Sequence, residues 1–331
     1  MKINSVVIGA GIGVKHVDAL NSVSNTEVIA ICEKDNIKRN YLKKKYKKIQ
    51  IISNYRDIFS IKKKINLISI ASYDSDHFKQ IKILSKICKN FIVEKPMVTT
   101  PKELEELRKI VKEKKLKIFS NLVLREVRMF QYLKKKIIKN QIYNIEADYL
   151  WGRVQKLFGW RLKEKNYSLT LGASIHMIDI VNWLIDELPV SIFTKGNKIV
   201  TKKSKFKKFS FLTHLLQYKN GLIVKISANA GAVHPHFHNI KIFEKNKTFF
   251  SNLNNQLLIS KSKNKLKIKK LNLPYPDKKN RKKMIQFFVN SLKKNKVISP
   301  SFNYLCNLMQ ICFSADQSLK IKKEIKIKYF R

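Results

Sequence analysis

Three of the nine glycines in this 331-residue chain fall within five residues, directly after a short apolar run. The run is Val6-Val7-Ile8, and it leads into Gly9, Gly11, Ile12 and Gly13. The run predicts a buried strand, and the glycines predict a tight turn into a helix that begins near Gly13. Backbone N–H groups at such a helix start suit a pyrophosphate. The third glycine comes one residue earlier than in G-x-G-x-x-G, so a plain tight turn is the alternative.

The next predicted strand, 28–32, ends on Glu33, 20 residues beyond Gly13. An acid at this position accepts hydrogen bonds from the ribose hydroxyls of a dinucleotide and repels a 2′-phosphate. Glu33 therefore favours NAD. Lys34 and Arg39 lie close enough in sequence to soften this preference, which keeps NADP as an alternative.

Two further predicted strands end on polar residues. Residues 65–71 are followed by Ser72, Asp74 and His77, and Phe91-Ile92-Val93 is followed by Glu94-Lys95-Pro96. Proline cannot donate to a strand ladder, so the second strand must end before it. Lys95 then lies at the carboxyl end of a strand, where open α/β sheets bind their ligands. The alternative is an ordinary surface lysine.

Helical and strand patterns alternate up to residue 122, with a helix at 100–115 and a strand at 117–122. This alternation predicts an α/β fold for residues 1–122, a Rossmann-type doubly wound parallel sheet. Residues 123–331 read differently. They predict an α+β domain on a large, mostly antiparallel sheet, with a hairpin at Lys219-Asn220-Gly221. Helices would cover one face of this sheet, and a partner subunit would cover the open face.

A predicted helix at 172–186 carries His176 and Asp179, which share a face because they are three residues apart. A histidine can exchange a hydroxyl proton near neutral pH. A core histidine held by hydrogen bonds is the alternative. Further on, His234, His236 and His238 would share one face of a strand by its two-residue period. Pro235 interrupts them and no fourth ligand is in view, so we expect a cleft edge or a subunit contact and no metal.

The formal net charge of +46 raises nucleic-acid binding as a further hypothesis. Only nine of the 69 basic residues are arginines, and the lysines are spread along the chain. Phosphate and base recognition relies on clustered arginine, so we expect no nucleic-acid partner. No apolar run is long enough to cross a membrane. The four cysteines form no metal or disulfide spacing, which favours a cytoplasmic protein.

The glycine turn, Glu33, Glu94-Lys95-Pro96 and the Gly172-x-x-x-His176-x-x-Asp179 helix together resemble the Gfo/Idh/MocA oxidoreductases. The resemblance spans nearly the whole chain, and Glu-Lys-Pro is its most specific part. It implies a Rossmann domain that binds NAD(P) and a C-terminal domain with an open sheet. It further implies a sugar, nucleotide-sugar or cyclitol substrate, and homodimers or homotetramers assembled through that sheet.

The resemblance also implies a role for each matching residue. Lys95 would position the reacting hydroxyl and lower its pKa, His176 would be the acid/base, and Asp179 would orient the site or bind a substrate hydroxyl. The pyrophosphate and ribose would be bound by Gly9, Gly11, Ile12, Gly13 and Glu33. The nicotinamide side would be formed by Ser72, Asp74 and His77, with further cofactor contacts from Glu94 and Lys95. Substrate would be bound by Asn121, Arg125, Trp160, Arg161 and Asp179.

Gly172 departs from the family pattern, because many members have an aspartate four residues before the histidine. The sequence allows two interpretations. Lys95 and His176 suffice, and the protein is an NAD(P)-dependent oxidoreductase that moves a hydride between nicotinamide and a sugar-type hydroxyl or ketone. Alternatively, the protein is a non-catalytic dinucleotide-binding sensor or regulator of the same fold. The exact substrate and the reaction direction stay open.

Overall fold

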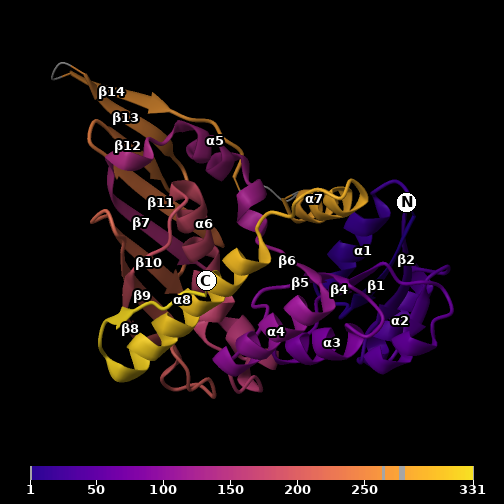
Figure 1. The fold of residues 1–331 in the computed structure, drawn as a ribbon. Coiled ribbons are helices and arrows are strands. Elements are labelled where there is room, and N and C mark those ends of the chain that lie inside the picture. The colour runs from indigo at the N-terminus through magenta and orange to yellow at the C-terminus, as the bar shows by residue number, and fades with distance from the viewer. Residues whose placement is uncertain (1, 263–264, 276–279, 331) are drawn as a thin grey trace. The chain divides into compact units, whose positions relative to one another are not determined.

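The computed structural model describes residues 2–262, 265–275 and 280–330. The chain divides into two compact units. Unit 1 comprises Met1–Val123 and Lys278–Cys306, and unit 2 comprises Leu124–Asp277 and Asn307–Arg331. Each unit is built around its own sheet (Figure 1).

Unit 1 contains a six-stranded sheet in which every neighbouring pair is parallel, in the order β3-β2-β1-β4-β5-β6. Its strands are β1 (Ile3–Ile8), β2 (Thr26–Cys32), β3 (Gln50–Ile52), β4 (Leu67–Ile70), β5 (Asn90–Val93) and β6 (Lys117–Ser120). The strand order reverses direction between β1 and β4, and sheets of this type bind ligands at the carboxyl ends beside that point. The predicted doubly wound parallel sheet is confirmed.

Helices cover both faces of this sheet. They are α1 (Gly13–Asn21), α2 (Asn36–Lys45), α3 (His77–Leu84), α4 (Pro101–Lys114) and α7 (Asn280–Lys293). The predicted start of α4 is confirmed, because Pro101 occupies the first turn and Thr100 Oγ1 accepts a hydrogen bond from Glu103 N at 3.2 Å. Figure 1 shows α1 and α7 on one face of the sheet and α3 and α4 on the other.

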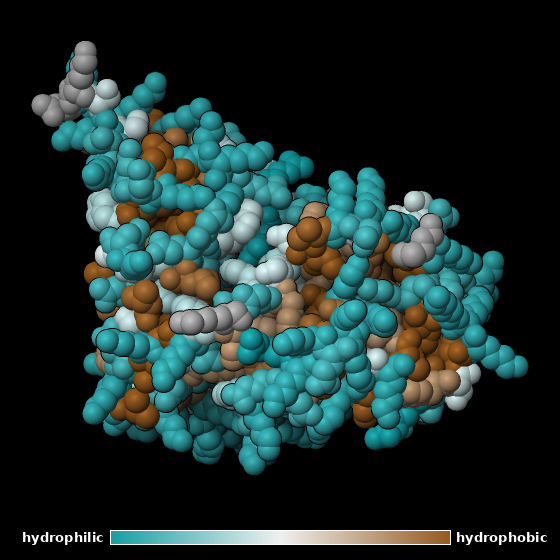
Figure 2. Space-filling model, in the orientation of Figure 1, coloured by the Kyte–Doolittle hydropathy of each residue, from teal (hydrophilic) through white to brown (hydrophobic). Residues whose placement is uncertain are grey.

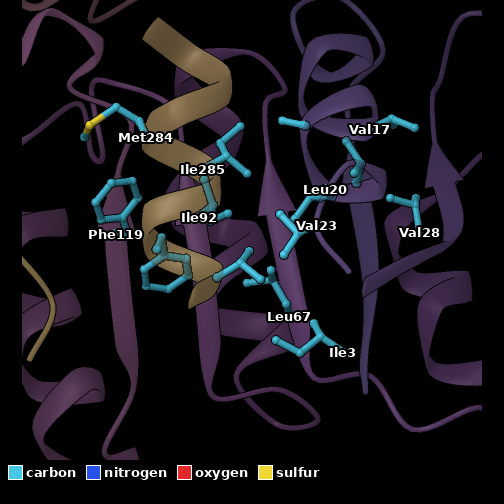
Figure 3. Close-up of a cluster of buried hydrophobic side chains, with 14 of the residues drawn as sticks. Ile3, Val17, Leu20, Val23, Val28, Leu67, Ile92, Phe119, Met284 and Ile285 are labelled. Atoms are coloured by element: carbon cyan, nitrogen blue, oxygen red, sulfur yellow. The ribbon is translucent and has the colours of Figure 1, made fainter. Parts of the chain in front are cut away.

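Helix α7 corrects the predicted domain boundary, which assigned every residue after 122 to the second domain. The helix belongs to unit 1, where Met284, Ile285 and Phe288 join the core formed by the sheet and α1. The Phe288 ring stacks on Phe119 of β6 with centroids 4.9 Å apart. Figure 3 shows Met284 and Ile285 beside Ile92 and Phe119. Burial of the apolar face of α7 against the sheet explains why the chain returns to unit 1 after unit 2.

Unit 2 contains a nine-stranded sheet in the order β14-β13-β12-β11-β7-β10-β9-β8-β15. Its strands are β7 (Ile142–Leu150), β8 (Ser191–Asn197), β9 (Phe211–Gln217), β10 (Ile223–Asn229), β11 (Phe237–Glu244), β12 (Lys247–Ser251), β13 (Gln256–Ser262), β14 (Lys265–Lys270) and β15 (Ile325–Lys326). All neighbouring pairs are antiparallel except β7 and β10. The predicted, mostly antiparallel sheet is confirmed, as is the hairpin at Gly221, which has φ +87°.

Side chains alternate along the central strands of this sheet, with Ile145, Ala147 and Tyr149 of β7 on the covered face. Helix α6 (Ile175–Ile185) packs against β7, and α5 (Arg128–Lys136) packs against α6. The long α8 (Phe302–Ile321) joins the sheet through Ser318 Oγ, which accepts a hydrogen bond from Thr194 N at 2.9 Å. The one-sided cover agrees with the sequence prediction.

The chain enters α6 through a π-helical turn, Thr170–Ser174, which buried polar contacts hold in place. Thr170 Oγ1 donates to Asp316 Oδ1 at 2.5 Å, and burial raises the pKa of Asp316 to about 6. Ser174 Oγ lies 2.8 Å from His214 Nε2, and His214 Nδ1 lies 2.9 Å from Thr194 Oγ1. The turn that precedes His176 is therefore fastened to both α8 and the sheet.

Hydrophilic side chains cover much of the surface that Figure 2 shows. Many of the lysines are highly exposed and have no acidic neighbour within 4 Å among the described residues. Within the described ranges, no helix is long and apolar enough to cross a membrane.

His214 predicts how stability depends on pH. Burial lowers the pKa of its imidazole from 6.5 to about 3, so the unfolded chain takes up a proton at higher pH than the folded chain does. The contribution is fully present above pH 6.5 and is lost as the pH falls toward 3. We expect His214→Gln to remove about 2 kcal/mol of the stability difference between pH 7 and pH 5. Urea unfolding of both proteins at the two pH values measures it, and equal pH dependence would contradict the assignment.

Candidate functional site

The glycine turn after β1 is shaped by the approach of the chain that follows β4. Gly9 has φ +88°, and a Cβ there would lie 2.5 Å from the carbonyl oxygen of Ala71. A Cβ on Gly13 would lie 3.1 Å from Val7, whereas one on Gly11 would meet nothing within 4 Å. Position 9 therefore requires glycine, because of its positive φ and the nearby carbonyl of Ala71. Gly11 leaves open space on one side of the turn. Open backbone at the start of α1 is the arrangement that a pyrophosphate needs.

Glu33 follows β2 and is buried, with its carboxylate turned toward the glycine turn. Its Oε2 accepts a hydrogen bond from Ala10 N at 2.7 Å, and its Oε1 accepts one from Asp35 N at 3.0 Å. The side chain therefore fixes the glycine turn relative to the end of β2. Arg39 is turned to the backbone, donating to the carbonyl oxygens of Glu33 and Lys34. Lys34 lies over the Tyr73 ring, 4.2 Å from its centroid.

A buried polar network surrounds Glu94, the residue before Lys95. Glu94 Oε1 lies 2.9 Å from His16 Nε2 and accepts a hydrogen bond from Asn121 Nδ2 at 2.9 Å. His16 Nδ1 lies 2.7 Å from Ser69 Oγ, and Arg281 Nε lies 3.4 Å from Glu94. Burial alone would raise the pKa of Glu94. The contacts with His16, Arg281 and Asn121 outweigh burial and hold that pKa well below its usual value.

This network contains residues that sequence reasoning missed. His16 on α1, Ser69 on β4 and Arg281 on α7 were not assigned a role, and neither the spacing nor the local pattern marks them. Asn121 was predicted to bind substrate and is completely buried, with its amide nitrogen bound to Glu94. Its Oδ1 accepts no hydrogen bond from any residue that the structure describes. This oxygen is therefore available to a donor on a ligand.

The loop after β4 is tied to the turn after β5. His77 is completely buried, with Nδ1 at 2.8 Å from the carbonyl oxygen of Pro96 and Nε2 at 3.3 Å from that of Ser72. Ser72 Oγ donates to Gln80 Oε1 at 2.8 Å, and Asp74 begins a short 3-10 turn before α3. The structure thus brings Ser72, His77 and the Lys95-Pro96 turn together. The buried His77 ring connects the loop after β4 with this turn.

In unit 2, His176 lies on the first turn of α6 and is 9% exposed. Its ring stacks on Tyr149 of β7, with centroids 5.7 Å apart and planes 7° apart. The rings of His236 and His238 also lie beside Tyr149, with centroids 5.2 and 4.8 Å from that of the tyrosine. Tyr149 was not predicted from the sequence. Stacking fixes the plane of the His176 imidazole.

Arg125 and Asp179, both predicted to bind substrate, bind each other. Arg125 Nε lies 3.1 and 3.0 Å from the two carboxylate oxygens of Asp179, and Arg125 Nη2 completes the pair. Both side chains are buried. A buried, bidentate pair of this kind is rigid. It connects α6, which carries His176 three residues before Asp179, to the segment that precedes α5.

The packing around Gly172 explains why an aspartate does not fit at this position. A Cβ at this position would lie 2.5 Å from Tyr167 Oη and 2.9 Å from Tyr167 Cε2 and Cζ. Tyr167 is buried against Phe206 and Trp160, with ring centroids 6.1 and 6.5 Å away. The phenol therefore occupies the space that any larger residue at 172 would need.

Arg161 lies among aromatic rings near the end of β7. Its Cζ is 4.3 Å from the centroid of Trp160, 5.0 Å from that of Trp151 and 5.8 Å from that of Tyr167. Trp151 and Tyr149 are two residues apart on the covered face of the β7 segment. The predicted residues Trp160 and Arg161 therefore belong to the same side of unit 2 as His176.

The three later histidines do not share a strand face as predicted. Strand β11 begins at Phe237, so only His238 lies within it. Pro235 cannot donate to a ladder, which explains why pairing starts after it. His234 turns back to the carbonyl oxygen of Pro235, whereas the His236 and His238 rings lie 4.9 Å apart. Among the described residues, no three His, Cys, Asp or Glu side chains are grouped to hold a metal ion.

Comparison with known proteins assigns both parts of the chain to one family. Residues 3–122 match the oxidoreductase family with an NAD-binding Rossmann fold, and residues 139–249 match the GFO/IDH/MocA C-terminal domain. The chain belongs to the GFO/IDH/MocA oxidoreductase family. The resemblance seen in the sequence is confirmed, and unit 1 contains its NAD-binding domain.

An uncharacterised oxidoreductase of Synechocystis sp. is 25% identical over 186 residues, which cover 54% of this chain and 50% of that protein. The chain thus matches about half the length of this curated relative. Two solved structures share the fold along nearly their whole length. Scyllo-inositol dehydrogenase from Lactobacillus casei, with bound NAD(H) and scyllo-inositol, has a TM-score of 0.82, 15% identity and coverage of 98% and 99%. UDP-N-acetylglucosamine 3-dehydrogenase from Acidithiobacillus ferrooxidans has a TM-score of 0.81, 15% identity and coverage of 97% and 99%.

Unit 1 has the features that NAD requires. The turn at Gly11 is open, Glu33 lies at the end of β2, and the buried Asn121 Oδ1 has no protein donor among the described residues. Lys95 belongs to unit 1 and His176 to unit 2. Their convergence on one substrate stays a prediction, as do the individual site assignments.

The contact between Gly172 and Tyr167 predicts strong coupling between these positions. Gly172→Ala forces a Cβ against the phenol and should destabilise the protein by about 1–3 kcal/mol, in spite of the better helix propensity of alanine. In a Tyr167→Ala background the same change should be neutral or stabilising. Thermal and urea unfolding of the four proteins of this cycle give the coupling energy. Equal effects of Gly172→Ala in both backgrounds would show that the phenol does not constrain position 172.

Proposed function

We propose that the protein is an NAD(P)-dependent dehydrogenase or reductase that acts on a CH–OH group of a sugar, nucleotide sugar or cyclitol. Family membership supports the redox class. The observation that carries the proposal is the position of Lys95, directly after β5 at the ligand-binding edge of the parallel sheet, anchored by the buried Glu94 and by Pro96. In the direction of oxidation, NAD supplies the acceptor for the hydride that leaves the substrate carbon.

Lys95 and His176 divide the work on the reacting hydroxyl. The ammonium of Lys95 holds the hydroxyl oxygen and stabilises the negative charge that develops on it. The imidazole of His176 takes the hydroxyl proton as the C–H electron pair departs, and returns a proton in the reverse direction. The Tyr149 ring fixes the imidazole plane, and the Arg125–Asp179 pair holds the helix beneath it. Asp179 is thus a positioning residue in this proposal.

The cofactor assignment extends from the glycine turn to the end of β6. Gly9, Gly11, Ile12 and Gly13 would hold the pyrophosphate, and Glu33 would lie beside the adenosine ribose. Ser72, Asp74 and Glu94 would form the nicotinamide side, with His77 holding the loop. The Oδ1 of Asn121 would accept a hydrogen bond from an N–H or O–H of a ligand. Glu33 favours NAD over NADP, because Arg39 is engaged by backbone carbonyls.

Substitution of Lys95 tests the proposal. Lys95→Ala removes the charge that stabilises the alkoxide, so we expect turnover to fall by roughly 10²–10⁴-fold with NADH affinity within about twofold of wild type. Lys89→Ala, at the amino end of β5, is the matched control and should leave both unchanged. Activity on a panel of sugars and cyclitols, together with NADH fluorescence titration, provides the measurements.

Equal loss of turnover and NADH affinity in Lys95→Ala would assign the lysine to cofactor binding instead. Tight NADH binding by the wild type with no turnover on any panel member would favour the alternative of a dinucleotide-binding regulatory protein. The steric exclusion of an acid at Gly172 is the observation that keeps this alternative in view.

We further propose a homodimer or homotetramer assembled through the open face of the unit 2 sheet. Leu215 of β9 and Ile223 of β10 are 47% and 45% exposed on this face, beside the Glu146, Lys225 and Lys241 ion pairs. Leu215→Glu should shift the mass measured by light scattering toward the monomer, while Lys320→Glu at the exposed end of α8, away from this face, serves as the charge control. A monomeric wild type would refute assembly.

The cysteines support a reducing, cytoplasmic location. All four cysteine side chains are buried, and none of them forms a disulfide. Burial raises the pKa of Cys32 and Cys306 to about 12 and that of Cys88 to about 11, which suppresses their reactivity as thiolates.

A further inference from the structure

In the described part of the chain, Arg161 is a partly buried arginine without an acidic partner, in contrast to Arg125 and Arg281. Arg125 pairs with Asp179 through two nitrogens, and Arg281 approaches Glu94 at 3.4 Å. Arg161 is half-buried, and its guanidinium donates through Nη1 to the carbonyl oxygen of Lys156 at 3.2 Å. Within the described ranges, no carboxylate lies within ion-pair distance of it.

The edge of the guanidinium opposite this contact carries Nε and Nη2. Arg161 Nε is buried and makes no hydrogen bond to any described residue. Nε and Nη2 together form the planar fork that accepts a carboxylate or phosphate in a bidentate manner. A buried N–H without an acceptor costs free energy, so a ligand that accepts from this edge would gain correspondingly.

Aromatic rings hold the guanidinium in place and keep it from turning to water. Trp160 lies nearest, and Trp151 and Tyr167 contribute two further rings within 6 Å of Cζ. Stacking of this kind pre-orients the planar group and reduces the entropy lost when a ligand binds. The site is therefore organised before any anion arrives.

The electrostatic surroundings add to the preference for an anion. Arg153 and Lys156 belong to the same short segment, 153–161. Burial lowers the pKa of Lys156, and the positive charges of Arg153 and Arg161 lower it further. These three cations repel one another, and an anion between them would relieve that repulsion. Glu164, the acid nearest in sequence, is buried, and Lys208 donates a hydrogen bond to its carbonyl oxygen.

This group is continuous with the proposed catalytic residue of unit 2. Trp151 follows Tyr149 by two residues, and Tyr149 stacks on His176. Tyr167, on the other side of Arg161, packs against Gly172 in the turn that leads into His176. A ligand whose hydroxyl reaches His176 therefore has Arg161 along the same wall of unit 2.

We propose that Arg161, supported by Arg153 and Lys156, forms an anion subsite, and that the substrate carries a phosphate or carboxylate group in addition to the reacting hydroxyl. This inference rests on the proposed function for the reaction and narrows its substrate class to anionic sugars. Neutral sugars and cyclitols would leave the Nε edge of Arg161 buried without an acceptor.

Binding measurements test this subsite without relying on turnover. Calorimetry on the full-length protein saturated with NADH compares glucose with glucose 1-phosphate, glucuronate and UDP-glucose, which separate a phosphate monoester, a carboxylate and a diphosphate. We expect at least one charged probe to bind roughly ten- to hundredfold more tightly than glucose. Absence of turnover with every probe would count against the proposed reaction and would leave this result intact.

Variants identify the residue responsible. Arg161→Gln should abolish the preference for the charged probe and leave glucose binding unchanged, and Arg161→Lys should recover only a small part because a lysine lacks the fork. Lys195→Gln, which removes a cation from over the Phe193 ring elsewhere on unit 2, is the matched control and should keep the full preference. No preference in the wild type, or equal weakening of all probes in Arg161→Gln with an unchanged unfolding temperature, would overturn the anion subsite.

Discussion

The buried carboxylate of Glu94 is the constraint on which the geometry of unit 1 depends. A charged group out of water is costly unless hydrogen bonds and opposite charges compensate it. Here the compensation comes from His16 on α1, Asn121 after β6 and Arg281 on α7. Ser69 on β4 holds the other ring nitrogen of His16. The carboxylate thereby ties the helix that follows the glycine turn to the end of β5. Lys95 is the next residue, so its backbone position is set by the same contacts that set the dinucleotide turn.

The elements that a local pattern encodes were predictable from the sequence. Apolar runs gave the parallel strands, the proline at 101 and threonine at 100 gave the start of α4, and Asn220-Gly221 gave a hairpin. The return of α7 to unit 1 was not predictable. Its apolar face shows that the helix packs on something, but a sheet in either domain would satisfy that face. His16 was missed for a related reason, because its partners lie 53 and 78 residues away.

Gly172 shows how a sequence departure changes its meaning in three dimensions. In the sequence, a glycine in place of an acid reads as the loss of a group. In the structure, the space beside this glycine is filled by the ring of Tyr167, five residues earlier. Volume in a packed interior is conserved, so the two positions constrain each other. An acid at 172 would require a smaller residue at 167, and a single substitution cannot restore it. The absence of a carboxylate at 172 and the presence of the Tyr167 ring are therefore two aspects of the same packing.

Arginine and lysine have separate uses in this chain despite the uniform excess of positive charge. Most lysines are solvated and flexible, and salt would screen the field that they produce together. The few partly buried arginines instead make defined contacts, with Asp179, with Glu94 and with the aromatic rings near the end of β7. A diffuse field can raise the local concentration of any anion, but it cannot distinguish one anion from another. Discrimination needs a planar fork held at a fixed position, and in unit 2 the ring-bound Arg161 meets that requirement.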